Sequence, residues 1–226
     1  MNDVPGWYGK LPSLGDFASR RLPVDFVEAW DAWLSQGLAD WRAADAAWLD
    51  EYLAAPAWCF LLGPQVIALP GAAPRGTVPA WAGVLMPSVD RVGRYFPFTL
   101  ASPVRALEAV DAGRLAHWLR MVAACAVDAM HGDWTLERLE QTLLELTDLT
   151  WPIGIDRGHG QFGELLERTA RQGDTALWWL PDQGTASLPR QTQGLPGGAA
   201  FARLLVGRPL DRASPPPPTP PEPEPT

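Results

Sequence analysis

The spacing of apolar residues predicts a long helical segment near the start of the chain. From Phe26 onward, apolar residues recur at steps of three and four, through Trp30 and Trp41 to Tyr52. This period places them on one stripe of a helix, with acidic residues on the opposite face. The stripe fits one long helix or two shorter ones. Gly37 is the expected joint, because glycine destabilises a helix interior by about 1 kcal/mol relative to alanine.

Short apolar runs bounded by glycine and proline predict the strands of a sheet. The expected strands cover residues 6–12, 57–62, 65–69, 81–86, 96–100 and 177–180. A helical period returns later in the chain. The expected later helices cover residues 107–130, a segment from a Thr135 cap through Leu146, residues 162–171, and a last short element at 201–206.

The end of the chain differs in composition from the rest. Eight of its 24 prolines lie in the last twelve residues. A segment of proline and glutamate cannot build a core and is expected to be extended polyproline in solvent. The sequence therefore predicts one domain over residues 1–210 and a disordered proline-rich tail over residues 211–226, which we interpret as a spacer rather than a ligand.

Charge and composition exclude several classes of protein. The chain has 18 basic and 26 acidic residues, a net charge of −8, so binding of nucleic acid through a basic surface is excluded. Twelve tryptophans and 47% apolar residues exclude disorder of the whole chain. No apolar run approaches the roughly 20 residues that span a bilayer, and the first residues lack the pattern of a secretory signal. We therefore expect a soluble protein that does not insert into a membrane.

No motif for catalysis or metal binding is found. A phosphate-binding loop and the Gly-x-Ser-x-Gly elbow of serine hydrolases are both missing. The three histidines are too widely spaced for a compact metal motif. Cys59 and Cys125 stand in apolar runs, which is typical of buried free thiols. We expect no catalytic residue, no cofactor and no metal.

Two loops carry a cluster of polar residues. They are Lys10, Ser13 and Asp16 in the first loop, and Asp90, Arg91 and Arg94 in the second. Lys10 is the one lysine beside 17 arginines. In one interpretation the loops form a patch at one end of the sheet, where arginine could bind a carboxylate or phosphate of a partner. In the other, which we favour, the charges pair with one another and hold the loops.

Several ordered motifs resemble those of one known family. They are residues 6–17 (GWYGKLPSLGDF), residues 30–34 (WDAWL), residues 83–97 (GVLMPSVDRVGRYFP) and the tryptophan pair at 178–179. Together they resemble the TagF family, also called ImpM, which is associated with type VI secretion. The resemblance covers most of residues 6–206 and leaves out the tail.

The resemblance implies both a fold and a role. It implies an α/β protein, a single three-layer α/β/α sandwich with a mixed, largely antiparallel sheet, and no enzymatic activity. It also implies a cytoplasmic regulator that represses type VI secretion after translation by binding the system's forkhead-associated scaffold protein. The family supplies no catalytic residues to carry over.

Two other functions remain open from the residues alone. The chain could be a structural assembly subunit of the secretion machine, or a small-ligand-binding module whose pocket is formed by the charged loops. For the regulatory role, replacing both Arg91 and Arg94 by alanine is expected to weaken partner binding and leave the melting temperature nearly unchanged.

Overall fold

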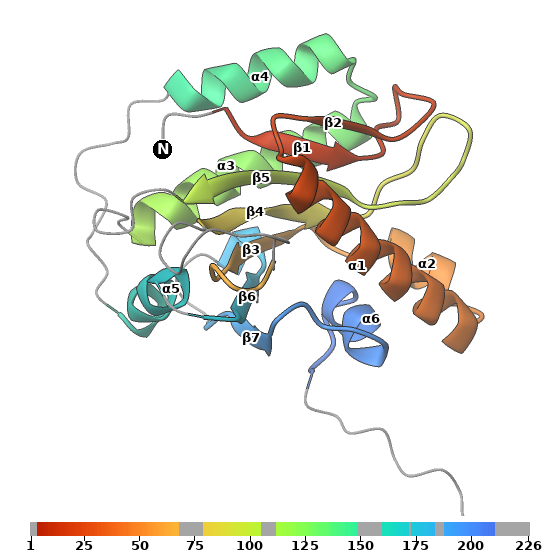
Figure 1. Cartoon of the computed structure of the whole chain (residues 1–226). Helices are drawn as coiled ribbons and strands as arrows, with labels where there is room; N and C mark the ends of the chain where they lie inside the picture. The colour runs from red at the N-terminus through yellow and green to blue at the C-terminus, as the bar shows by residue number, and fades with distance from the viewer. Residues whose placement is uncertain are drawn as a thin grey trace, which may run out of the picture.

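One sheet organises the protein. The computed structural model describes residues 4–67, 79–104, 112–148, 160–171, 173–183 and 188–210. Within these ranges, seven strands form a sheet in the order β2-β1-β5-β4-β3-β6-β7 (Figure 1). The strands are β1 (Gly6–Gly9), β2 (Ala18–Arg20), β3 (Trp58–Leu62), β4 (Ala80–Met86), β5 (Phe98–Val104), β6 (Thr175–Trp179) and β7 (Arg190–Gln193).

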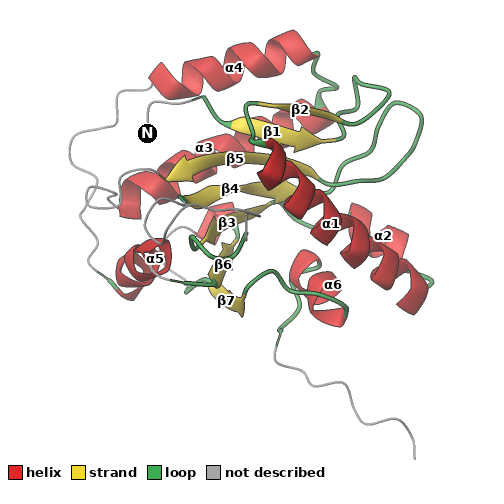
Figure 2. Cartoon of the chain, viewed as in Figure 1, coloured by secondary structure: helices red, strands yellow, loops and turns green. Residues whose placement is uncertain are grey.

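Helices cover both faces of this sheet (Figure 2). They are α1 (Val24–Ala44), α2 (Trp48–Leu53), α3 (Ala112–His131), α4 (Leu136–Asp148), α5 (Gln161–Arg171) and α6 (Ala199–Leu205). α1, α2 and α6 pack on one face, and α3, α4 and α5 on the other. The expected three-layer α/β/α class is confirmed. All the pairings between the described strands are antiparallel, so this part of the sheet is not mixed as expected.

The central strands explain why two helical layers are needed. Every residue of β3 and β4 is buried. Side chains alternate between the faces of a strand, so Cys59 and Leu61 enter the core under α3, while Trp58 and Phe60 enter the core under α1. A strand that is apolar on both faces is stable only when both faces are covered.

The long helical segment is two helices, and Gly37 is not their joint. α1 ends at Ala44, and the chain turns where the Asp45 carboxylate accepts a hydrogen bond from the Ala47 amide at 2.8 Å. Gly37 lies inside α1 against α6, where an added Cβ would lie 2.5 Å from ring atoms of Phe201. The expectation was wrong because the glycine allows close packing of two helices and does not break one.

The other predicted elements have mixed outcomes. The Thr135 cap is confirmed, since the Arg138 amide donates to its hydroxyl at 3.3 Å. Residues 65–67 form a turn and a bend instead of a strand. β2 and β7 were not predicted, because neither has an apolar alternation. Residues 68–69 of the predicted strand, 107–111 of the predicted helix, and the tail at 211–226 lie outside the described residues.

Within the described ranges, no helix has the length and apolarity that crossing a bilayer requires, and no three histidine, cysteine or carboxylate side chains gather as metal ligands would. Cys59 and Cys125 are both buried free thiols, as expected. Burial raises the pKa of Cys125 to about 12, so its reactive thiolate form is scarce at neutral pH.

We expect Gly37→Ala to lower the free energy of unfolding by about 1–2 kcal/mol, because overpacking against Phe201 outweighs the gain in helix propensity. Urea denaturation measures this change. Gly197→Ala is the matched control, since no atom lies within 4 Å of a Cβ at Gly197. An unchanged or increased stability of Gly37→Ala would contradict the packing role.

Candidate functional site

Two loops emerge side by side from one end of the sheet. The first loop, residues 10–17, joins β1 to β2, and the second loop, residues 87–97, joins β4 to β5. The strand register places them together: Phe98 at the start of β5 pairs with Gly9 at the end of β1 and with Met86 at the end of β4. The loops therefore hold the six polar residues that the sequence singles out in one region.

The buried carboxylate of Asp90 lies at the centre of this region. It accepts hydrogen bonds from the backbone amides of Val92 at 3.0 Å and Arg94 at 2.9 Å. The Arg94 side chain donates to it at 2.7 Å, and the ammonium of Lys10 lies 3.1 Å away. Burial alone would raise the pKa of Asp90, but the donors from Arg94, Lys10 and Val92 outweigh burial and hold this pKa well below its ordinary value.

Lys10 is buried on the first loop and points at this carboxylate. Its side chain is 4% exposed, and its ammonium also lies 3.4 Å from the Arg94 carbonyl oxygen and 4.8 Å from the centre of the Phe17 ring. A compact ammonium fits this enclosed position, whereas a guanidinium is a larger planar group. The charge of Lys10 is therefore used inside the protein.

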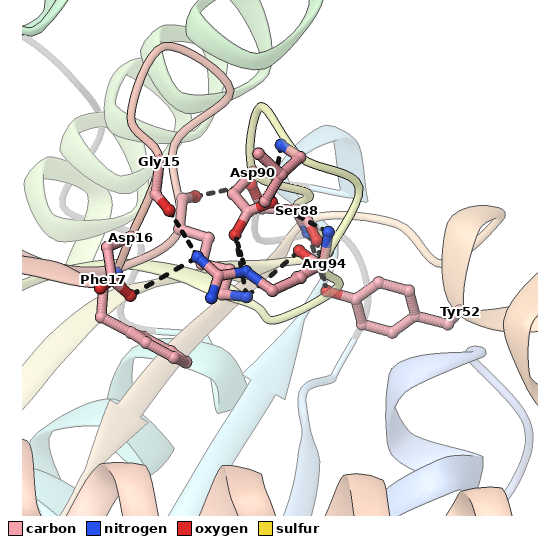
Figure 3. Close-up of polar contacts among 9 residues, drawn as sticks. Gly15, Asp16, Phe17, Tyr52, Ser88, Asp90 and Arg94 are labelled. Carbon is pink, nitrogen blue, oxygen red and sulfur yellow. Dashed lines mark hydrogen bonds and ion pairs between the residues drawn. The ribbon is translucent and has the colours of Figure 1, made fainter.

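Arg94 joins the second loop to the first (Figure 3). Its guanidinium donates to the Gly15 carbonyl oxygen and lies 3.6 Å from the carboxylate of Asp16. Together with its bonds to Asp90, these contacts make Arg94 part of the scaffold of the loops. The expectation that Arg94 could be replaced at little cost in stability does not fit these contacts.

Arg91 differs from Arg94. Its backbone amide donates to the Leu14 carbonyl oxygen at 3.3 Å, but no described carboxylate lies within 4 Å of its guanidinium. It lies next to Val92 at the turn of the second loop, where Val92 is 65% exposed. Gly93 closes this turn with a φ of 81°, which favours glycine. The turn thus presents one basic and one apolar side chain to solvent.

Two residues of this region were missed from the sequence. Ser88 donates from its hydroxyl to the Lys10 carbonyl oxygen at 2.6 Å. The Tyr52 hydroxyl of α2 donates to the Ser88 carbonyl oxygen and accepts from the Ser88 amide, both at 2.9 Å. Tyr52 belongs to the apolar stripe of the helical segment, so no sequence signal pointed to this polar contact.

The six residues predicted from the sequence do not form one network of contacts. Ion pairs join Lys10, Asp16, Asp90 and Arg94, as the favoured interpretation expects. That interpretation is wrong for Arg91, which forms no ion pair with a described carboxylate because its guanidinium extends over Gly15 instead. Ser13 takes no part, because its buried hydroxyl has no hydrogen-bond partner among the described residues. A separate hollow of about 300 Å³ between α1, α2 and α6 is lined by none of the six. These pairings count against a charged ligand pocket made by the loops.

We expect the stability that Asp90 provides to decrease at acidic pH. Its pKa is lower in the folded protein than the ordinary value of about 3.9 in the unfolded chain. The contribution is therefore complete above about pH 5 and is lost as the pH falls, because the unfolded chain then binds the extra proton. Urea denaturation should show wild type more stable than Asp90→Asn at about pH 7, with the difference shrinking towards about pH 2. Asp16→Asn, whose side chain is 79% exposed, is the control; a pH-independent difference would contradict this account.

We expect Lys10→Arg to lower the melting temperature, because the guanidinium must enter a space that Asp90, Arg94 and Phe17 enclose around an ammonium. Thermal unfolding followed by circular dichroism measures this. Lys10→Met is the companion variant, since it keeps an unbranched stem and removes the charge. A melting temperature of Lys10→Arg equal to that of wild type would show that any cation suffices.

Comparison with known proteins agrees with the resemblance seen in the sequence. The family model for the TagF N-terminal domain, described as type VI secretion system-associated, matches residues 6–146, which include both loops. The crystal structure of PA0076 from Pseudomonas aeruginosa PAO1, at 2.05 Å resolution, is similar with a TM-score of 0.69 and 32% identity. The alignment covers 96% of this chain and 100% of that one. No match was found among curated proteins. The chain belongs to the TagF family of type VI secretion-associated proteins.

Proposed function

We propose that this protein is a non-enzymatic regulator of type VI secretion that acts in the cytoplasm by binding the forkhead-associated scaffold protein. Membership of the TagF family supports the link to type VI secretion. The lack of enzymatic activity, repression after translation, the identity of the scaffold and the compartment are the parts that we propose.

The ionised state of the Asp90 carboxylate is the observation that supports a binding role over a catalytic role for these loops. A general base needs a pKa near the working pH, so that it can take up a proton. Four donors keep Asp90 ionised and its pKa far below that range. The most enclosed carboxylate of the loops is thus suited to hold their shape and poorly suited to accept a proton.

The fixed shape of the loops favours recognition of a protein partner. Contacts from Arg94 and from the Arg91 backbone join the second loop to the first, and Tyr52 fixes Ser88 from α2. A surface that is already ordered loses less conformational entropy on binding than a flexible one. Loops on a rigid sheet are also the usual place for binding residues.

We expect the purified full chain to bind the purified scaffold, and its overproduction to lower the amount of type VI substrates in the medium. Deletion should raise that amount while transcripts of the cluster stay unchanged, because the proposed control follows translation. Calorimetry and immunoblots of culture medium measure the two effects. Failure to bind together with unchanged secretion would overturn the proposal, and loss of secretion on deletion would point to an assembly subunit.

A further inference from the structure

We propose that the exposed tip of the second loop, made of Arg91 and Val92, is the partner-binding surface. We further infer that the partner is a protein that presents a carboxylate beside an apolar side chain. This inference rests on the proposed function, because it names the surface through which the regulator binds.

The apolar side chain of the tip is not explained by the fold. Val92 is 65% exposed. Single exposed apolar residues are common, but turn positions are usually occupied by glycine, proline, asparagine, aspartate or serine. The turn uses the amide of Val92, which donates to Asp90, and Gly93 provides the positive φ. The valine side chain contributes nothing to this geometry and remains available for contact.

The basic part of the tip determines the chemistry of the partner. The Arg91 guanidinium has no described carboxylate within 4 Å, in a chain whose net charge is −8. It extends over the first loop, where its Nη2 lies 3.9 Å from the position that a Cβ on Gly15 would take. A guanidinium binds a carboxylate through two parallel hydrogen bonds, and arginine is enriched where partners bind most strongly. A carboxylate of the partner therefore fits this position.

The buried ion pair beneath the tip supports the same conclusion. Removing two charges from water is costly, so a buried pair is weak evidence for stability. Here the Lys10–Asp90 pair positions the turn, since Asp90 also accepts the amides of Val92 and Arg94. The contacts thus hold the backbone of Arg91 and Val92 in one arrangement before a partner arrives, as in a preorganised binding surface.

Phe17 covers the buried pair from the first loop. Its ring lies over the Lys10 ammonium at 4.8 Å and meets the Phe96 ring edge to face at 4.7 Å. Replacing Phe17 would therefore expose Lys10 and disturb the fold. For this reason the test leaves Phe17 unchanged and uses Val92 and Arg91, whose side chains are exposed.

Photo-crosslinking in cells that carry the secretion cluster tests the surface directly. The full chain is made with p-benzoylphenylalanine at position 92 or, as the matched control, at position 188, where Leu188 is 57% exposed. We expect a covalent product with a type VI secretion protein from position 92, none from position 188, and loss of the product when Arg91→Glu is added. The absence of a product from position 92, or an equal amount of product from position 188, would overturn the proposal that the tip binds the partner.

The identity of the captured protein separates the two proposals. Capture of the forkhead-associated scaffold supports both. Capture of a different secretion protein supports the tip as a binding surface and contradicts the proposal that the scaffold is the partner. If the scaffold binds the chain in calorimetry but position 92 gives no product, the proposed function stands and the tip is not the binding surface.

A charge variant gives an independent measure on purified proteins. Arg91→Glu should raise the Kd for the purified partner by about tenfold or more, because the partner carboxylate would then face a like charge. The melting temperature should stay unchanged. Arg171→Glu on α5 is the matched control, since Arg171 is 54% exposed. Recovery of affinity by an acid-to-arginine change in the partner would support the pairing. Wild-type affinity of Arg91→Glu would overturn it.

Discussion

Both faces of the sheet are apolar, and the arrangement of the protein follows from covering them. β3 and β4 have no exposed residue, so the chain must place helices on two sides. The indole N–H groups then need acceptors: Trp30 donates to Thr99 at 2.9 Å, and Trp58 donates to the Leu205 carbonyl oxygen at 3.0 Å. These bonds help to fix α1 and α6 on the sheet, because an unpaired buried donor is costly. With both faces covered by helices, the two loops extend from the end of the sheet, where we propose that a partner binds.

The loops are built on a buried charge, which is unusual for a surface feature. An apolar contact would hold a loop with less loss of hydration energy. A carboxylate, however, can accept several donors at once, and Asp90 takes two backbone amides and two cationic side chains. This single group therefore specifies the turn of one loop and its contact with the other. The same logic accounts for the one lysine of the chain, since a compact ammonium reaches the carboxylate from the first loop.

Much of the fold could be predicted from the sequence because the core elements are strongly periodic. The helical stripe and the apolar runs of β3, β4 and β6 are clear, since buried positions there are nearly all apolar. β2 and β7 were missed because they are short edge strands whose sequences, ASR and RQTQ, carry no apolar alternation. Gly37 was misread because a glycine that breaks a helix and a glycine that lets two helices approach look alike in one sequence.

The candidate site was predictable as a pair of loops but not in its internal roles. Composition pointed to Lys10, Asp90, Arg91 and Arg94. The expected internal pairing is found for Lys10 and Arg94 with Asp90, but not for Arg91. The difference between Arg91 and Arg94 depends on which side chain turns back to Asp90, and this follows from the fold of the turn. Val92 was not recognised as a binding residue, because one apolar residue in a loop gives no sign in the sequence that it will be exposed.

The central claim is that a partner binds the preformed tip of the second loop. Hydrogen exchange of the full chain, measured alone and with the purified forkhead-associated scaffold, tests it most directly. The account predicts that amides near the turn at residues 91–94 are already protected in the free protein, since Asp90 and the first loop bind several of them. It also predicts that added protection is confined to residues 13–17 and 90–96. Protection that appears on α4 and α5 and leaves both loops unchanged would contradict it.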